Sequence, residues 1–389
     1  TELALALGEA GLNATLVFVG DPDKPAVEAW AKNVELRRWC QWISKYHPSG
    51  VYDGEQGKID DFTQSAPPFI VSDIVKPSQR RGERVLVLAE DWQVAPAMLH
   101  LDRALQEAGL RQHAVLAWNA NNTYGFDTID WAALANAAHI TCVSRYMKFE
   151  LGLVGVQALV VPNGVPAGLL ELSNESDVKT LERALRGRKT LLKVGRYDPD
   201  KRWLQAIDAV ANLRGAGADV QLIVRGGKEP YGQTIFDRAR ARGLSITDLT
   251  LTESTPDQLA QAIGDEGADV VNLKSFLPNE TLYALYAAVD AVLANSGKEP
   301  FGLVGLEVMA CGGIPVCGST GEDYARPFEN AVVCDTGDPA ELAAYLEQLF
   351  EDPRLARRIR KRAAKTARKY TWPNVFDLLD LKLGFLEAR

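Results

Sequence analysis

The sequence predicts an α/β protein with two doubly wound, Rossmann-like domains in tandem. Short apolar segments of strand length alternate with segments of helical periodicity, and short turns separate them. This alternation is typical of a parallel sheet with helices on both faces, and it occurs twice, on either side of a polar break at 166–188. The chain has 389 residues, which is enough for two or three domains of about 150 residues each.

The first domain is expected over residues 1–165. A helix at 1–11, a strand at 13–20 and a helix at 26–46 open it, whereas the Gly-, Pro- and Asp-rich segment 48–84 predicts an irregular connection. Regular alternation follows, with strands at 84–89, 113–118, 140–144 and 159–162 and helices at 95–108 and 131–138.

The second domain is expected over 166–371, and a final helix at 372–389 is expected to cross back to the first domain. The two domains should face each other across a cleft between the carboxyl ends of their sheets, where ligands usually bind. The predicted strands of this domain are 190–195, 220–225, 249–251, 270–273, 291–294, 315–317 and 331–333, and its helices are 201–214, 232–242, 256–265, 279–288, 302–311, 322–326, 338–350 and 353–369.

Composition and charge exclude several classes of protein. Hydrophobic residues make up 47% and charged residues 24% of the chain, so it is not disordered throughout. The net charge of -8 argues against general nucleic-acid binding, which needs an excess of cations. The longest uncharged run, 151–170, is interrupted by Gly and Pro and is therefore not a membrane helix. Five cysteines without a C-x-x-C pair predict reduced thiols in a cytoplasmic protein and no zinc site.

The most informative segment runs from Glu299 to Glu307. It follows the predicted strand at 291–294, and its helix is expected to begin near Phe301 and Gly302. The unpaired amides at a helix N-terminus can hold a phosphate, and glycine allows a ligand to approach the backbone. Glu299 could then hydrogen-bond sugar hydroxyls, and Glu307 could accept both hydroxyls of a ribose. A helix with an acidic start and one solvated carboxylate is the purely structural alternative.

A second segment ends a predicted strand at Gly195 and places Arg196 and Lys201 in the following turn. Two cations at the mouth of a sheet can neutralise a diphosphate, with Arg acting as a fork and Lys as a point charge. Basic residues on a surface loop between a strand and a helix explain the same pattern equally well.

Together the two segments resemble the retaining glycosyltransferases of family 4, which have the GT-B fold. In that family the E-x7-E motif corresponds to Glu299 and Glu307, and the G-R-x4-K motif corresponds to Gly195, Arg196 and Lys201. The resemblance covers nearly the whole chain. Further similar segments are Ser296, 161–165 and 310–316.

The resemblance implies a hexosyltransferase that moves a sugar from a nucleotide-sugar to a hydroxyl acceptor with retention of anomeric configuration. It implies no metal and no other cofactor, because the nucleotide-sugar is a co-substrate. The nucleotide (UDP, GDP or ADP) and the acceptor (a saccharide, a lipid-linked compound or a small molecule) stay open. Glu299, Arg196 and Lys201 would be catalytic. The donor-binding residues would be Gly195, Arg196, Lys201, Glu299, Phe301, Gly302, Leu303 and Glu307.

The chain departs from this family on the predicted acceptor side. Many relatives carry His-Asp after a strand of the first domain, where this chain has Glu90 and Asp91, and the His often found after the next strand is missing. We expect Glu90, Asp91, Asn119, Asn121 and Asn122 to contact the acceptor, with turn formation as the alternative for the asparagines. The missing histidines keep two other functions open. One is a catalytically idle sugar-nucleotide-binding protein, and the other is an epimerase or phosphorylase of the same fold.

Nine Lys or Arg residues lie between Arg354 and Lys369, and we expect them to spread around more than one face of a helix. A solvated helix is the simpler interpretation. Contact with an anionic membrane surface is the alternative, and it would suit a lipid-linked acceptor. We accordingly expect a cytoplasmic protein, with peripheral contact at the inner face of a membrane as the alternative.

The first helix runs directly into the strand at 13–20. In a doubly wound sheet, such a helix follows a strand and a turn. We therefore expect a native segment of roughly 15–40 residues to precede Thr1. That segment would hold the first strand of the domain and a loop facing the donor phosphates and the acceptor.

Overall fold

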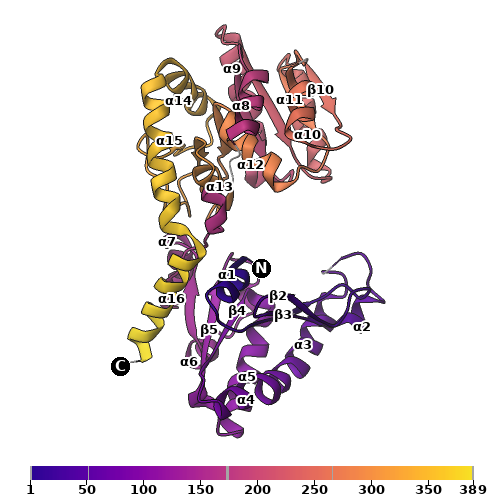
Figure 1. The fold of residues 1–389 in the computed structure, drawn as a ribbon, viewed down its shortest axis with the longest axis vertical. Coiled ribbons are helices and arrows are strands. Elements are labelled where there is room, and N and C mark those ends of the chain that lie inside the picture. The colour runs from indigo at the N-terminus through magenta and orange to yellow at the C-terminus, as the bar shows by residue number, and fades with distance from the viewer. Residues whose placement is uncertain (1, 51, 172–174, 265, 388–389) are drawn as a thin grey trace. The chain divides into compact units, whose positions relative to one another are not determined.

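The chain divides into two units (Figure 1). Unit 1 comprises Thr1–Pro162 and Trp372–Arg389, and unit 2 comprises Asn163–Thr371. The predicted boundary at 165 therefore lies inside unit 2. The computed structural model describes residues 2–50, 52–171, 175–264 and 266–387, so the parts of predicted elements that fall on 1, 51, 172–174, 265 and 388–389 lie outside the described residues.

Unit 1 contains two sheets. In the first, β1 (Ala14–Val19) pairs in parallel with β3 (Val34–Trp39), which pairs antiparallel with β2 (Val27–Ala31). The strand predicted at 13–20 is confirmed as β1. The second sheet is parallel, with its strands in chain order, and consists of β4 (Val85–Glu90), β5 (Ala114–Ala120), β6 (His139–Cys142) and β7 (Leu159–Val160).

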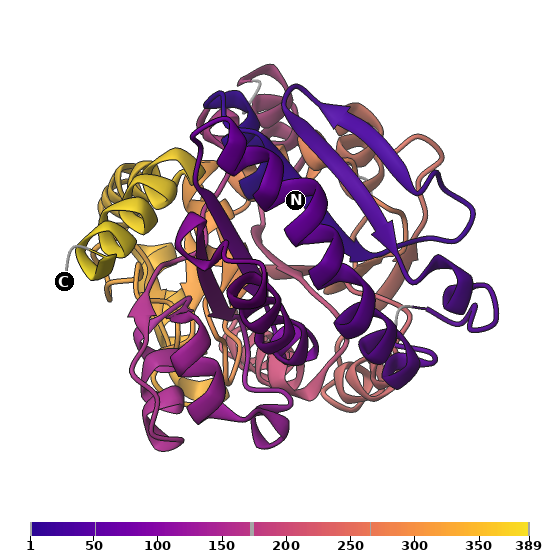
Figure 2. The same cartoon turned by 90° about the horizontal axis from the view of Figure 1, so that it is seen from below.

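The predictions for residues 26–46 and 48–84 are wrong. The first segment contains the β2–β3 hairpin. Its side chains alternate between exposed and half-buried along β2, and between buried and half-buried over the first four residues of β3, with the period of a strand. The second is mainly helical, with α3 (Glu55–Phe69) next to the hairpin (Figure 2). A π-helical turn follows the adjacent Pro67 and Pro68 of α3, which lack the N–H groups that the regular ladder needs.

The remaining helices of unit 1 follow the predicted alternation, with α7 as an addition. Ser144 begins α7 by accepting a hydrogen bond from the Met147 amide at 3.1 Å. The helices of this unit, besides α3, are α1 (Glu2–Glu9), α2 (Gln41–Ser44), α4 (Lys76–Arg80), α5 (Ala95–Glu107), α6 (Trp131–Ala137), α7 (Arg145–Leu153) and α16 (Trp372–Glu387).

Unit 2 is built on a seven-stranded parallel sheet in the order β10-β11-β9-β8-β12-β13-β14. The order reverses direction between β8 and β12, which is the switch point where ligands bind in such sheets. The strands are β8 (Lys189–Val194), β9 (Val220–Arg225), β10 (Ile246–Leu249), β11 (Val270–Leu273), β12 (Ala291–Ala294), β13 (Pro315–Cys317) and β14 (Val332–Val333).

The helices of unit 2 match the predicted ones closely. Three predictions need correction. The break at 166–188 contains α8. The strand predicted at 249–251 begins earlier in the chain and ends at Leu249. The helix predicted at 322–326 is a turn, beside which Glu322 accepts hydrogen bonds from two backbone amides. The helices are α8 (Glu175–Ala184), α9 (Trp203–Gly215), α10 (Tyr231–Ala241), α11 (Pro256–Gly264), α12 (Asn279–Ala288), α13 (Leu303–Ala310), α14 (Pro339–Glu351) and α15 (Pro353–Ala367).

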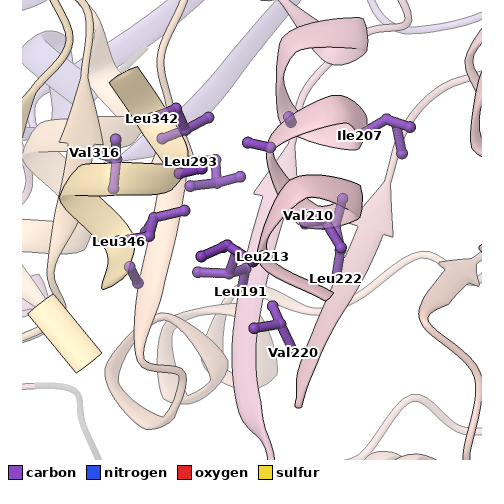
Figure 3. Close-up of a cluster of buried hydrophobic side chains, with 14 of the residues drawn as sticks. Leu191, Ile207, Val210, Leu213, Val220, Leu222, Leu293, Val316, Leu342 and Leu346 are labelled. Atoms are coloured by element: carbon purple, nitrogen blue, oxygen red, sulfur yellow. The ribbon is translucent and has the colours of Figure 1, made fainter. Parts of the chain in front are cut away.

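The core of unit 2 fixes the carboxyl ends of its strands. Figure 3 shows Leu191, Leu222 and Leu293 of three strands facing α9 and α14, which contribute Val210 and Leu346. All five side chains are at most 1% exposed. Burial of each such side chain stabilises the fold by roughly 1.5–3 kcal/mol. The loops that follow β8, β9 and β12 therefore start from rigid positions.

The C-terminal helices belong to different units. α15 packs on α13 and α14 within unit 2. In α16, Val375, Leu379 and Leu383 recur at helical spacing and pack with Val161 and Leu159 of unit 1. None of the described helices has the length and apolar composition needed to cross a lipid bilayer.

Candidate functional site

The turn after β8 carries the first group of predicted site residues. Gly195 follows the strand, and the Arg196 side chain is exposed at its end. The Trp203 indole donates a hydrogen bond to the Arg196 carbonyl at 2.8 Å, which fixes the turn against α9. Asp198 caps the short helical turn that holds Lys201, by accepting a bond from the Asp200 amide at 2.8 Å.

The segment after β12 carries the second group. Gly302 adopts φ +80° and forms the N-cap of α13, so the helix begins at Leu303. Phe301 is buried beside Tyr324, with ring centroids 5.6 Å apart, and the Tyr324 hydroxyl donates to the Gly302 carbonyl. These contacts hold the first amides of α13 in a fixed direction, and those amides and the helix dipole favour an anion.

The two groups are joined directly, although about a hundred residues separate them in the chain. The Lys201 ammonium lies 2.6 Å from a Glu299 carboxylate oxygen. The Gly297 amide donates to the Asp200 carbonyl at 2.7 Å, and the Lys298 amide donates to the Asp200 carboxylate at 3.0 Å. Because β8 and β12 are neighbours in the sheet, their carboxyl ends bring a cation and a carboxylate together beside the start of α13.

Glu322 is a site residue that the sequence analysis missed. It is 5% exposed and accepts hydrogen bonds from the Gly318 amide at 3.1 Å and the Thr320 amide at 3.2 Å. Burial, and to a smaller extent the charge of Glu299, raises the pKa of Glu322 to about 7. A β-carbon at Gly302 would lie 2.7 Å from the Glu322 Cγ, so Glu322 closes one side of the helix start. A glycine-rich turn after a strand, 318–322, was the signal available in the sequence.

Glu307 lies inside α13 and is half-buried. Burial is the main cause that raises the pKa values of Tyr286 and Cys311, and the charge of Glu307 adds to both shifts. Glu307 therefore lies near these two groups, in the second half of α13, whereas the Lys201–Glu299 pair lies before the helix begins. The structure thus places all eight predicted donor residues on two adjoining loops and one helix.

A third loop, after β9, borders the same edge of the sheet. The Tyr197 amide donates to the Glu229 carboxylate at 3.0 Å, and Gly226 packs against the Tyr197 ring with no room for a β-carbon. Arg225 stacks on Phe276 at 5.5 Å from the ring centroid, while the Phe276 side chain is 73% exposed. The Arg225 Nε is buried without a hydrogen-bond partner in the described part of the chain. Neither Arg225 nor Phe276 was predicted as a site residue.

The predicted acceptor-side residues of unit 1 gather at the carboxyl ends of β4 and β5. Asn122 donates to the Asp91 carboxylate at 3.1 Å, and Asn119 donates to the Asn121 side-chain oxygen at 3.2 Å. Glu90 is exposed beside them. These five residues lie at or just after the ends of two adjacent strands, and we call them the polar cluster.

Asp91 has an unusual backbone. Its φ is 68° and its ψ is 168°, a region that residues other than glycine rarely adopt. Its carbonyl accepts a bond from the Trp118 indole at 2.9 Å, and the Trp92 ring that follows packs on Gly125. Burial raises the pKa of the Asp91 carboxyl, and Glu90 adds to the rise. Backbone strain held by such contacts is a recurring feature of functional sites.

Within the described ranges, no group of three or more His, Cys, Asp and Glu side chains is arranged to hold a metal ion.

Comparison with known proteins gives a family match within unit 2. Residues 179–366 match the family model described as glycosyl transferases group 1. D-inositol 3-phosphate glycosyltransferase of Thermomonospora curvata is 32% identical over 207 residues, which cover 50% of this chain and 42% of that relative. The match therefore spans less than half the length of this curated relative.

Two solved structures have the same fold. Sucrose-phosphate synthase from Thermosynechococcus elongatus aligns with a TM-score of 0.68 and 19% identity, over 100% of this chain and 92% of that chain. Anabaena HepE in complex with UDP-glucose aligns with a TM-score of 0.58 and 19% identity, over 81% of this chain and 82% of that chain. The predicted α/β fold of GT-B type is confirmed, and its structural neighbours are glycosyltransferases.

Proposed function

We propose that this chain is a retaining glycosyltransferase that moves a hexosyl group from a nucleoside-diphosphate sugar to a hydroxyl acceptor. One observation carries the proposal. The Lys201–Glu299 pair lies at the start of α13, where a cation, a carboxylate and unpaired helix amides converge. Such a site can bind a diphosphate and a sugar ring at the same time.

The chemistry that this arrangement supports is stabilisation of the leaving group. As the bond from the sugar to the diphosphate breaks, negative charge grows on the diphosphate oxygens. Arg196, Lys201 and the first amides of α13 would hold that charge, and their positions are fixed before the reaction. Glu299 would position the sugar ring, and Glu307 would accept the ribose hydroxyls. The Lys201–Glu299 contact would orient both side chains in the absence of donor.

We propose UDP as the nucleotide, because HepE, one of the neighbours in fold, binds UDP-glucose. Arg225 and Phe276 form a flat, partly exposed pair at the same sheet edge, which suits stacking with a nucleobase. GDP and ADP are the alternatives.

We propose that the acceptor binds unit 1 at the polar cluster of Glu90, Asp91, Asn119, Asn121 and Asn122. Amide and carboxylate side chains in one cluster can hydrogen-bond several hydroxyls of a saccharide, a lipid-linked compound or a small polyol. The names of the matching proteins support a hydroxyl-rich acceptor, since they include glycosyltransferases of inositol 3-phosphate and a sucrose-phosphate synthase.

Two measurements test the proposed function. First, UDP-, GDP- and ADP-sugars are screened for thermal stabilisation, since a ligand at 100 times its Kd adds roughly 2.7 kcal/mol to stability. Second, the product formed from the stabilising donor is analysed by NMR for the configuration at its anomeric carbon. Retained configuration is expected. Stabilisation without transfer to any acceptor indicates the idle binding protein, and release of the epimerised sugar or of a sugar phosphate indicates the epimerase or the phosphorylase.

We also propose that the protein works in the cytoplasm, bound peripherally to a membrane through α15. The prediction that the basic residues spread around the helix is wrong. Leu355, Ile359 and Ala363 are buried on one side of α15, and the exposed cations share the opposite side because their spacing follows the helical repeat. This basic face consists of Arg354, Arg357, Arg358, Lys361, Arg362, Lys365, Arg368 and Lys369.

The basic face suits an anionic lipid surface. The sequence from 353 to 371 contains no Asp or Glu, although the whole chain has a net charge of -8. Each Lys or Arg near an anionic bilayer contributes about 1 kcal/mol. The ninth cation, Arg360, has a structural role, because its guanidinium donates to the carbonyls of Ala287 and Gly312 at 2.7 and 2.9 Å.

Flotation with vesicles of phosphatidylglycerol and phosphatidylcholine tests this part of the proposal. The wild-type protein should bind at low salt and be released at high salt. The triple variant Arg357→Glu, Arg358→Glu and Lys361→Glu should not bind. Reversal of the exposed Lys179, Arg183 and Arg186 around α8 is the matched control and should bind normally. Equal binding by both variants would contradict a docking role for α15.

A further inference from the structure

Lys193 is a buried lysine that belongs to neither the proposed donor site nor the proposed acceptor site. It lies on β8, two residues before Gly195, and is 2% exposed. Its ammonium donates to the Leu293 carbonyl at 3.0 Å and to the Asn295 side-chain oxygen at 2.8 Å. The same nitrogen lies 5.2 Å from the centroid of the Trp203 ring. Lys193 therefore lies directly beneath the turns that carry both groups of site residues.

The charge of Lys193 has no carboxylate partner. None of the ion pairs among the described residues includes it, and both of its hydrogen-bond acceptors are neutral. The carboxylate whose charge acts on it belongs to Glu299, which is already paired with Lys201. A buried ion without a counter-ion is costly, because the surrounding protein replaces little of its hydration.

The titratable and charged groups around Lys193 come from three segments. Lys201 and Arg202 in the turn before α9 disfavour its protonated form, whereas Glu299 after β12 and Cys334 after β14 favour it. Burial of the Cys334 thiol raises the pKa of this group to about 12, so it is uncharged near neutral pH. Burial, with the charges of Lys201 and Arg202, lowers the pKa of Lys193 to about 7.

A hydrogen-bonded network connects Lys193 to the site above it. The Asn295 amide donates to Gln205 at 2.8 Å, and Gln205 donates to the Asp338 carbonyl at 3.2 Å. On the other side, the Trp203 ring contacts Lys193 and its indole N–H holds the Arg196 carbonyl. A change in the charge of Lys193 therefore acts on the turns that hold Arg196 and Glu299.

We propose that donor binding to unit 2 is coupled to protonation of Lys193, whose ammonium is the buried counter-charge of the donor diphosphate. This inference rests on the proposed function, because it takes the diphosphate to bind at Arg196, Lys201 and the start of α13. An anion at that position favours the charged form of a nearby amine. The free protein would then take up a proton from solvent when the donor binds.

Thermodynamic linkage between donor binding and proton binding determines how donor affinity changes with pH. Donor raises the pKa of Lys193 above its free value of about 7, so proton uptake occurs at pH values above 7 and below the raised value. Donor affinity should accordingly be highest at pH 6 or below. It should fall by up to about tenfold per pH unit within that window, since one proton is linked to binding.

Calorimetric titration tests the proposal. The probe is UDP-glucose, with GDP-mannose and ADP-glucose as alternative probes, and binding is measured at pH 8 in buffers of different ionisation enthalpy. These donors are phosphodiesters and do not titrate in this range, and all four histidines of the chain precede residue 140, in unit 1. The wild-type protein should take up a substantial fraction of one proton.

Three variants identify the group that binds the proton. Lys193→Met keeps the size of the side chain and should bind donor without proton uptake and with an affinity that no longer depends on pH. Lys189→Met on the same strand is the matched control and should keep the uptake, as should Glu322→Gln, which removes the other group with a pKa of about 7. If Lys193→Met does not fold, Lys193→Gln replaces it.

The outcomes separate this inference from the proposed function. Binding of a probe without proton uptake, or uptake that persists in Lys193→Met or is lost in Glu322→Gln, would overturn the coupling and leave the proposed function intact. If none of the three probes binds, the proposed donor site is wrong and the coupling is wrong with it.

Discussion

The carboxyl edges of the two units carry different chemistry on similar parallel sheets. In unit 2, charged groups from three loops are locked together, as in the Lys201–Glu299 pair and the backbone bonds between Asp200 and Gly297. In unit 1, the edge carries amides and one strained carboxylate, Asp91. A diphosphate needs fixed cations and helix amides, whereas hydroxyls need donors and acceptors of modest charge. The difference supports the proposal that the donor binds unit 2 and the acceptor binds unit 1.

The comparison predicts that losing a cation from unit 2 has the largest effect. Lys201→Ala and Arg196→Ala should each lower turnover by roughly 10²-fold or more, the scale of removing one preorganised charge partner. Steady-state kinetics with saturating acceptor measure this. Lys179→Ala, an exposed lysine of α8 in the same unit, should leave turnover unchanged. Turnover near the wild-type value in both site variants would refute the assignment of the donor to unit 2.

The strands of unit 2 were predicted more accurately than those of unit 1, and the reason is physical. The strands β8, β9 and β11 of unit 2 are largely buried, so each has an apolar centre with few polar residues, and this centre stands out in the sequence. The strands of the first sheet in unit 1 are largely half-exposed, so apolar and polar residues are mixed along them without a long apolar run. Pattern alone could not decide between a strand and a helix there.

Prediction of the site residues from the sequence is limited in a similar way. Arg196, Lys201, Glu299 and Gly302 stand in motifs whose spacing in the chain indicates their role. Glu322 was missed although the glycine-rich turn 318–322 is visible in the sequence, because its burial and its bonds to the Gly318 and Thr320 amides exist only in the folded chain. Sequence reasoning therefore identified the residues of the proposed donor site and missed one that packs beside them.

A second variant separates backbone strain from the shape of the donor site. Gly302→Ala forces a left-handed backbone on alanine and pushes its β-carbon against Glu322, so turnover should fall by up to about 10²-fold, the scale of a misplaced reacting group. Gly312→Ala is the control, since Gly312 has φ +78° and open space around its β-carbon. It should lose only about 1 kcal/mol of stability and keep its turnover. Equal turnover losses in both variants would show that strain alone matters.

A third variant tests the assignment of the acceptor to unit 1. Asp91→Asn keeps the oxygen that accepts from Asn122 but removes the charge, so the KM for the acceptor should rise by about tenfold while the donor Kd stays constant. Because burial raises the pKa of Asp91, acceptor use in the wild-type protein should decline as the pH falls through that raised value. Asp127→Asn, an exposed carboxylate of the same unit, is the control. A changed donor Kd in Asp91→Asn would remove the distinction between the two units.

The smallest expected effect is on stability without any ligand, and Glu322 and Lys193 of unit 2 should show it. The folded pKa of Glu322 is about 7, above its ordinary value of 4.5, so its contribution to stability is lost as the pH rises from 4.5 to 7. The folded pKa of Lys193 is about 7, below its ordinary value of 10.5, so its contribution increases as the pH rises from 7 to 10.5. Each group changes the free energy of unfolding by at most about 1.4 kcal/mol per pH unit.

The opposite pH dependences of these two contributions can be tested with variants. We compare the free energy of unfolding of each variant with that of the wild-type protein. For Glu322→Gln, this difference should increase between pH 4.5 and 7 and stay constant above pH 7. For Lys193→Met, it should stay constant below pH 7 and decrease above pH 7, because only the wild-type protein gains stability there. Urea denaturation at fixed pH values measures both differences, and Asp127→Asn, which changes an exposed carboxylate of unit 1, should show neither. If both unit 2 variants instead differ from the wild-type protein by a constant amount at every pH, neither group changes its protonation near neutrality. The unit 2 edge would then act as a fixed arrangement of charges, without any response to protons.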